Sequence, residues 1–185
     1  MKDLGDLKFF LGIEFARSKD GIVMSQRKYA LELISEMGLN GAKPVQAPLD
    51  FNLRLTSIGY DTNVKEVGEE QNDRPLTDVA KYQRLVRRLL YLTMTRMDIA
   101  FAVQALSQFM HKPKESHMET ALRVVRYIKS ALGLGLMIPA QSSELLTTYC
   151  DSDWGTFLET KRSITGYLVK FGNALASWKS KKHEQ

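Results

Sequence analysis

The sequence predicts an α+β chain in which a β-hairpin and a block of helices precede a small antiparallel sheet. Three observations predict this class: a turn signal at Asp20-Gly21 between two runs of strand formers, apolar residues at helical spacing over 82–132, and short strand-like runs over 134–178. Apolar residues make up 44% and charged residues 25% of the 185 residues, which is ordinary for a folded globular chain and excludes wholesale disorder.

The N-terminal part is expected to form the hairpin and one helix. Residues 7–15 form one predicted strand, and residues 21–24 resume the apolar pattern after the turn. Ser25 stands at the predicted helix N-cap, and Gly38 supplies the stop at the end of that helix. Apolar residues of the helix recur at Ala30, Leu33, Ile34 and Met37.

Residues 54–80 are polar and lack periodicity, so they are expected to form a long loop or linker. Three helices are predicted after it: one with Arg84, Arg87 and Arg88 opposite its apolar face, one starting near Asp98, and one with Pro113 in its first turn. Their apolar faces comprise Tyr82, Leu85, Val86, Leu89, Leu90 and Thr93; Ile99, Ala102, Val103, Leu106 and Phe109; and Met118, Ala121, Leu122, Val125, Ile128 and Leu132.

The last third of the chain is predicted to be strands. They cover 134–138, 145–150, 164–171 and 174–178, and the pair Gly172-Asn173 is a turn signal between the last two. The sequence therefore places a sheet after the helices.

Charge and composition limit the function classes. The formal net charge is +5, which permits a polyanionic partner without requiring one. Cys150 is the only cysteine, so neither an internal disulfide nor a multi-cysteine zinc site is expected. No apolar run is long enough to span a bilayer, and residues 1–6 do not resemble a signal peptide, so a cytoplasmic or nuclear location is expected.

Asp151 and Asp153 follow an apolar strand, where alternate residues face one side of a sheet. Carboxylates placed in this way suit Mg²⁺, whereas the alternative is a strand-end turn in which the aspartates only cap backbone amides. Spacing alone favours the turn. No HExxH, Walker A, G-x-G-x-x-G or G-x-S-x-G motif is present, which argues against those enzyme classes.

Basic side chains of the helical block and the C-terminus are candidates for phosphate contacts, because Lys and Arg supply most sequence-independent affinity for nucleic acids. A solvated helix face explains them equally well, and the sequence leaves both readings open. The candidates are Arg84, Arg87, Arg88, Arg123, Arg126, Lys129, Lys179, Lys181 and Lys182.

Taken in order, these segments resemble the Pol polyprotein of Ty1/copia-type LTR retrotransposons. The similarity covers nearly the whole chain outside 55–78, and several colinear motifs are more specific than any one. The matching motifs are Met1 to Glu14, Gly21 to Tyr29, Tyr82 to Val86, Leu89 to Thr93, Thr95 to Ala100, Leu106 to Met110, Arg123 to Lys129, Asp151 to Trp154, Arg162 to Tyr167 and Ser177 to Lys182.

The resemblance implies an architecture. Residues 1–53 would be the end of the reverse-transcriptase palm, with its last β-hairpin, and the first thumb helix; 54–80 a variable linker; 81–140 the helical thumb/connection; and 141–185 a truncated ribonuclease H-like domain with an incomplete antiparallel sheet. The helical block would then grip an RNA–DNA or DNA duplex, and the rest of Pol would be a partner if expressed in frame.

The resemblance also assigns Asp151 as a remnant catalytic, metal-binding aspartate, with Asp153 as a second metal candidate. The parent enzyme, an RNA-directed DNA polymerase with ribonuclease H activity, would use Mg²⁺. Its other catalytic carboxylates would precede residue 1 or follow residue 185. We therefore expect no tight Mg²⁺ binding and no catalysis by this chain alone. The alternatives are a non-enzymatic interaction or effector-like protein from the same element, and a small metal-dependent nuclease.

Overall fold

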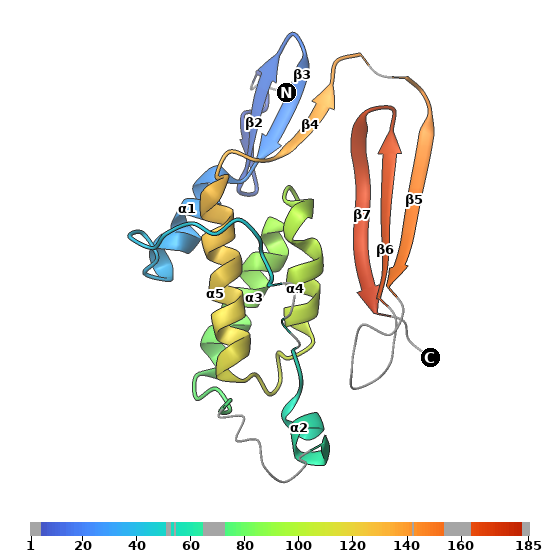
Figure 1. The fold of residues 1–185 in the computed structure, drawn as a ribbon. Coiled ribbons are helices and arrows are strands. Elements are labelled where there is room, and N and C mark those ends of the chain that lie inside the picture. The colour runs from blue at the N-terminus through green and yellow to red at the C-terminus, as the bar shows by residue number, and fades with distance from the viewer. Residues whose placement is uncertain are drawn as a thin grey trace.

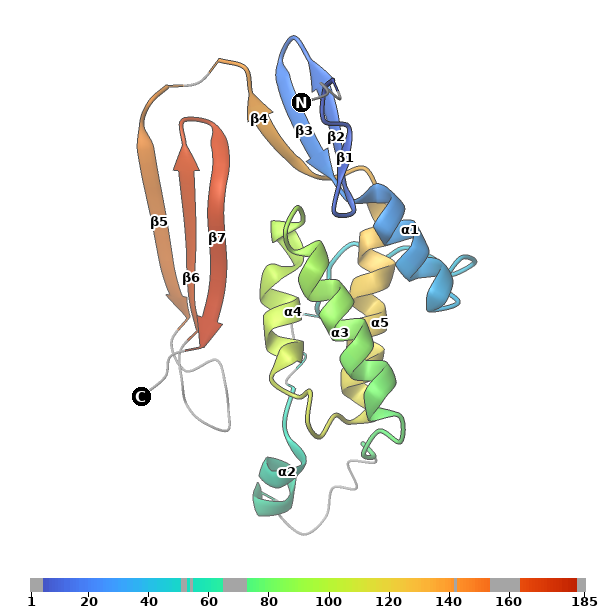
Figure 2. The ribbon, with the colours of Figure 1, turned by 180° about the vertical axis from the view of Figure 1, so that it is seen from behind.

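The fold is described from a computed structural model of the chain, over residues 5–50, 53, 55–64, 73–141, 143–153 and 164–182. Two antiparallel sheets flank a block of helices, which confirms the predicted α+β class (Figures 1 and 2). In order, the elements are β1 (Phe9–Phe10), β2 (Ile13–Ser18), β3 (Gly21–Ser25), α1 (Arg27–Glu36), α2 (Ile58–Val64), α3 (Val79–Leu92), the 3₁₀ helix η1 (Met97–Ile99), α4 (Ala100–Ser107), α5 (Glu115–Ser130), β4 (Leu136–Pro139), β5 (Leu146–Asp153), β6 (Ile164–Phe171) and β7 (Ala174–Lys182).

The first sheet contains two features that the sequence did not predict. The single strand expected over 7–15 is wrong, because Leu11 and Gly12 adopt φ values of 47° and 76° and turn the chain between β1 and β2. Two consecutive residues with positive φ suit the tight turns that match the twist of antiparallel strands. In addition, β4 joins this sheet after α5, which gives the strand order β1-β2-β3-β4.

Two glycines, one at each end of the β3–β4 pairing, allow these strands to approach each other. A Cβ at Gly21 would lie 2.1 Å from the Ile138 carbonyl oxygen, and a Cβ at Gly135 would lie 2.1 Å from the Met24 carbonyl oxygen. Because no side chain fits at such distances, glycine at these two positions is required for the long-range strand pairing.

Helix α1 ends as predicted but begins one residue later than expected. Gln26, not Ser25, is the N-cap, because Ser25 still pairs within the sheet. At the other end Gly38 has φ 70°, and the amides of Gly38 and Leu39 donate to the carbonyls of Ser35 (3.0 Å) and Ile34 (2.9 Å). This is the Schellman arrangement, which satisfies carbonyls at the helix end.

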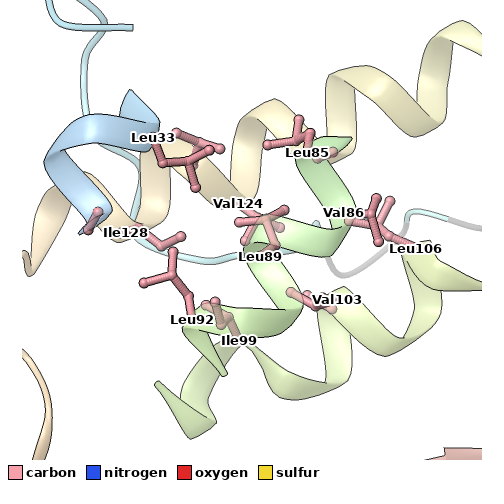
Figure 3. Packing of buried hydrophobic residues seen from close by; sticks show 14 of the residues in the cluster. Leu33, Leu85, Val86, Leu89, Leu92, Ile99, Val103, Leu106, Val124 and Ile128 are labelled. Carbon is pink, nitrogen blue, oxygen red and sulfur yellow. The ribbon is translucent and has the colours of Figure 1, made fainter. Parts of the chain in front are cut away.

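The main core lies where α1, α3, α4 and α5 meet, and Figure 3 shows its side chains converging. Burial of each large aliphatic side chain contributes about 2 kcal/mol. The predicted faces are largely confirmed, but Leu90 is 37% exposed, while Val124 is fully buried and was missed. The residues labelled in the figure are Leu33, Leu85, Val86, Leu89, Leu92, Ile99, Val103, Leu106, Val124 and Ile128.

Two helix starts differ from the predictions. Asp98 lies in η1 ahead of α4 and binds the Arg96 guanidinium instead of capping the following helix. Helix α5 begins at Glu115 with Lys114 as its N-cap, so Pro113 lies just before the helix and not in its first turn.

The segment expected as a loop over 54–80 contains α2 and is anchored to the start of α5. The Lys114 ammonium lies 2.7 Å from an Asp61 carboxylate oxygen and 2.9 Å from one of Asp73, and it also donates to the Thr56 hydroxyl. Lys114 is only 3% exposed, so these contacts satisfy a buried charge.

The second sheet has the order β5-β6-β7, with the turn at Gly172 and Asn173 as predicted. Its strands are longer than expected: β5 reaches Asp153 and β7 reaches Lys182. The sheet contacts the helical block through Trp178, whose indole N–H donates to the Thr93 carbonyl at 3.1 Å.

Candidate nucleic-acid interface

The outer face of α3 carries a compact group of arginines. The 3.6-residue period buries Leu85 and Leu89 and directs Arg84 and Arg87 to solvent. Together with Arg88 they line a shallow groove of about 360 Å³, whose other lining residues are Tyr29, Ala80 and Gln83. The helix thus brings three of the predicted cations to one concave surface.

Arg88 differs from its two neighbours because α1 already holds it. Its guanidinium forms an ion pair with Glu36, its Nε donates to the Tyr29 hydroxyl at 3.3 Å, and its Cζ lies 4.8 Å from the Tyr29 ring centroid. Arg84 and Arg87 make no ion pair with any residue that the structure describes. Their charges are therefore the most available in the groove.

Lys129 on α5 binds backbone carbonyls of the chain and does not face solvent as Arg84 and Arg87 do. Its ammonium donates to three backbone carbonyls of the loop after α1: Leu39 at 3.1 Å, Ala42 at 2.8 Å, and Asn40. An ammonium has three N–H donors, so these carbonyls use all of them. Lys129 fastens this loop to the last turn of α5.

Arg123 and Arg126 continue the same attachment along α5. Arg123 forms an ion pair with Asp50 at 2.7 Å, and Arg126 Nε donates to the Lys43 carbonyl at 2.9 Å. The predicted basic stripe on α5 therefore binds the chain's own segment 39–50, whereas Arg84 and Arg87 of α3 face solvent.

The C-terminal lysines lie on β7. Lys179 is exposed at the edge of a cleft between the second sheet and α4. The backbone of Lys181 and Lys182 continues the strand, but their side chains lie outside the described part of the structure.

Asp151 lies within β5, opposite Gly166 of β6, so for this residue the turn alternative is wrong. Its exposed side chain lines the same cleft, which has a volume of about 270 Å³ and is also lined by Phe101 and Trp178. Asp153 is the last residue of the same strand, and its side chain lies outside the described part of the structure. The residue that follows it, Trp154, also lies outside the described part.

The described residues do not fit a magnesium site. Among them, no three His, Cys, Asp or Glu side chains gather closely enough to hold a metal ion. Mg²⁺ requires near-octahedral oxygen coordination, which one described carboxylate does not provide.

Sequence reasoning missed two buried cations. Arg96 is 3% exposed, binds Asp98 and donates to the Ala131 carbonyl, and Lys114 binds Asp61 and Asp73. For Lys114 the only signal was the acidic character of the segment before α3, which does not specify a partner; for Arg96 it was Asp98, two residues further along the chain.

The Lys114 ammonium helps to lower the pKa of the two carboxyl groups that it contacts, Asp61 and Asp73. Burial acts to raise the pKa of Asp73, but hydrogen bonds from Ser116 and Lys114 outweigh it and lower that pKa below 3.8. The pKa of Asp61 is lowered in the same way, against the effect of burial, by hydrogen bonds from Lys114 and Thr56. Both groups therefore remain ionised at neutral pH.

No helix in the described part of the chain combines the length and apolar character needed to cross a membrane.

The chain is similar to several known proteins. The chain is 35% identical over 184 residues to the retrovirus-related Pol polyprotein from transposon RE1 of Arabidopsis thaliana; the match covers 100% of this chain and 12% of that protein. It is 33% identical to an uncharacterized mitochondrial protein of the same plant, with 98% of this chain and 70% of that protein covered.

A third similarity is to the secreted RxLR effector protein 161 of Plasmopara viticola, at 39% identity over 102 residues, 55% of this chain and 72% of the effector. No family model matches the chain, and no solved structure matches it.

Proposed function

The chain belongs to the Pol polyproteins of copia-type LTR retrotransposons, and from this premise we propose that it binds a nucleic-acid duplex without processing it. The duplex is RNA–DNA hybrid or DNA, held weakly and in a salt-dependent way. The chain spans 12% of the RE1 Pol polyprotein, so the activity of a whole Pol protein is not carried over to it.

One observation carries the proposal: Arg84 and Arg87 are exposed, lie one turn apart on α3 and form no ion pair with a described residue. Cations without an internal partner gain most from phosphate, because binding breaks no existing salt bridge. Phosphate contacts also release counterions, which makes the affinity fall steeply with salt.

The proposal centres on α3 and gives the α5 cations a supporting part. Because Lys129, Arg123 and Arg126 already bind segment 39–50, a phosphate would have to displace these contacts. Lys179, Lys181 and Lys182 of β7 are proposed as secondary phosphate contacts.

The binding test is a salt titration with a labelled RNA–DNA hybrid, comparing the wild type with the Arg84→Gln/Arg87→Gln double variant. The variant should bind more weakly, and the slope of log affinity against log salt should become shallower by about two. A matched control, Arg17→Gln/Lys19→Gln, removes the same charge from the exposed end of β2 and its turn. Equal losses in both double variants would refute the α3 interface.

We also propose that this chain alone has neither polymerase nor nuclease activity, because the described residues do not gather the ligands for Mg²⁺. Primer extension and hybrid cleavage, each assayed with Mg²⁺, should show no turnover. Turnover that Asp151→Ala abolishes would overturn this part and leave the binding proposal intact.

The rest of a Pol polyprotein, if expressed in frame, is the proposed protein partner, in the cytoplasm or nucleus. The supporting observation is an apolar surface at β1, where Phe9 is 54%, Phe10 56% and Leu11 69% exposed. Contiguous exposed apolar residues of this kind mark protein contacts.

A second candidate is an effector-like interaction protein from the same element. It is supported by the similarity that covers 72% of the secreted RxLR effector. A purified chain that has no affinity for the hybrid at low salt, and that forms a stoichiometric complex with one protein, would favour this candidate over duplex binding.

A further inference from the structure

The second sheet and α4 enclose the cleft of about 270 Å³ described above. Figures 1 and 2 both show α4 as the helix beside β7, and the two elements are in contact. The helical wall is lined by Met97, Ala100 and Phe101, and the Phe101 ring is 42% exposed. Sites that enclose a whole small molecule usually have roughly 300–1,000 Å³, so this cleft suits a single side chain.

The floor of the cleft is a row of three residues that lie side by side across the sheet. Asp151 of β5 is paired with Gly166 of β6, which is paired with Ser180 of β7. Paired residues share a face, and Ser180 follows Trp178 by two residues, so this row faces the helices. A Cβ at Gly166 would meet no atom within 4 Å. A carboxylate and a hydroxyl therefore flank an open space, with their backbones about 10 Å apart at about 4.8 Å per strand.

Neither polar group of this row has a partner among the described residues. Asp151 forms no ion pair or hydrogen bond with them. The Ser180 hydroxyl oxygen is buried and likewise has no hydrogen-bond partner there. Lys179 also lines the cleft, but alternation along β7 directs its side chain to the other face of the sheet. The cleft thus offers a cation an unpaired carboxylate and offers a hydrogen-bond donor an unused acceptor.

We propose that this cleft binds an arginine side chain of a partner protein. A guanidinium is planar and has five N–H donors on different edges, so one group can donate to Asp151 and to Ser180 together. Its faces are free to pack over the open backbone of Gly166 and against the Phe101 ring as a cation–π contact. A lysine ammonium has the same charge but is a compact point charge, which does not span two acceptors in this way.

The charge of the cleft distinguishes this partner from nucleic acid. The Asp151 carboxylate repels a phosphate and forms no ion pair with a described residue, whereas Arg84 and Arg87 on α3 attract one. Arginine binding in the cleft and duplex binding at α3 therefore concern different residues. Either one is able to fail in experiment without the other.

The test uses the full chain with Trp154→Phe, in which Trp178 is the only tryptophan, and follows the indole N–H signal of Trp178 by NMR. The probe is N-acetyl-arginine amide, and the comparison is its citrulline analogue, which has a similar shape without the charge. The arginine probe should shift the signal saturably. It should bind about tenfold more tightly than the citrulline probe, as expected for a partly exposed ion pair together with a cation–π contact.

Two substitutions test the residues of the floor. Asp151→Asn keeps the shape of an exposed side chain and should remove the preference for arginine over citrulline. The matched control Asp20→Asn removes the same charge from the exposed turn between β2 and β3 and should retain that preference. Gly166→Val places a side chain suited to a strand in the open space and should abolish binding.

The indole signal without probe reports whether each variant keeps the contact between Trp178 and Thr93. Equal affinity for the two probes would overturn the proposal, as would arginine binding that survives Asp151→Asn or Gly166→Val. Guanosine, a neutral nucleoside, is titrated as well. If it binds more tightly than the arginine probe, the cleft belongs to an unpaired base of a nucleic acid and the proposal is wrong.

Discussion

Replacing His117 with glutamine should remove a pH dependence of stability that this single imidazole creates. His117 is fully buried at the start of α5, its ring is stacked on Phe109 with centroids 4.0 Å apart, and its Nδ1 accepts the Lys114 amide at 3.0 Å. Glutamine is a common residue at this position of a helix and can accept the same amide. The substitution therefore keeps the helix cap and removes the titrating group.

The magnitude follows from the pKa of His117. Burial, and then the Lys114 ammonium, lower this pKa from 6.5 to about 4, against the opposing charges of Asp73 and Asp61. Between these values the unfolded chain holds a proton that the native chain does not, so stability falls as pH falls from 6.5 towards 4. At 1.36 kcal/mol per pKa unit, the loss is about 2 kcal/mol by pH 5 and about 3 kcal/mol in full.

The assay is urea unfolding at pH 7.5 and pH 5. Wild type should lose about 2 kcal/mol more than His117→Gln between the two pH values. Loss of the stacking on Phe109 affects the variant equally at both pH values and cancels in this difference. The carboxylates of Asp61 and Asp73, with pKa values lowered below 3.8, do not titrate in this window.

His111→Gln, at an exposed imidazole, is the control and should retain the wild-type pH dependence. The same pH dependence in wild type and His117→Gln would refute the reasoning, because it would show that the buried imidazole is not the group that titrates.

Three further outcomes are expected. Leu89→Ala removes a fully buried side chain from the core and should lower the free energy of unfolding by about 3 kcal/mol in urea titrations, with an unchanged m-value. Arg96→Leu leaves the Asp98 carboxylate without its cation and should cost about 3 kcal/mol, seen as a lower melting temperature that Asp98→Asn partly restores. Gly135→Ala adds a methyl group 2.1 Å from the Met24 carbonyl oxygen, and hydrogen exchange should show faster opening of β3 and β4 with unchanged protection in α3.

Much of the fold was predictable because its signals are local. The apolar period of α3 predicted the burial of Leu85 and Leu89, and Gly38 predicted the end of α1. The missed turn at Leu11 is explained by its residue type, since leucine rarely adopts positive φ and gives no turn signal. The missed helix α2 has few apolar residues, so no period marked it.

For the candidate site, residue types were predictable but partners were not. The sequence identified the basic residues of α3 and α5 as one class, with the same charge and similar spacing. The structure separates them, because Lys129 and Arg126 bind carbonyls of a loop more than 80 residues earlier, whereas Arg84 and Arg87 face solvent. Sequence spacing describes neighbours on one element and carries no information about which distant carbonyl a cation meets.

The sequence by itself determined the α+β class, the helical periods, the turns at Asp20 and at Gly172, and the resemblance to copia-type Pol polyproteins, all of which depend on residues close together in the chain or on their order. Only the tertiary structure decided that β4 pairs with β3 in the N-terminal sheet and that Lys114 holds the segment before α3. These contacts join residues far apart in the chain, and they form because packing of the helical core brings particular backbone and charged groups within reach of one another.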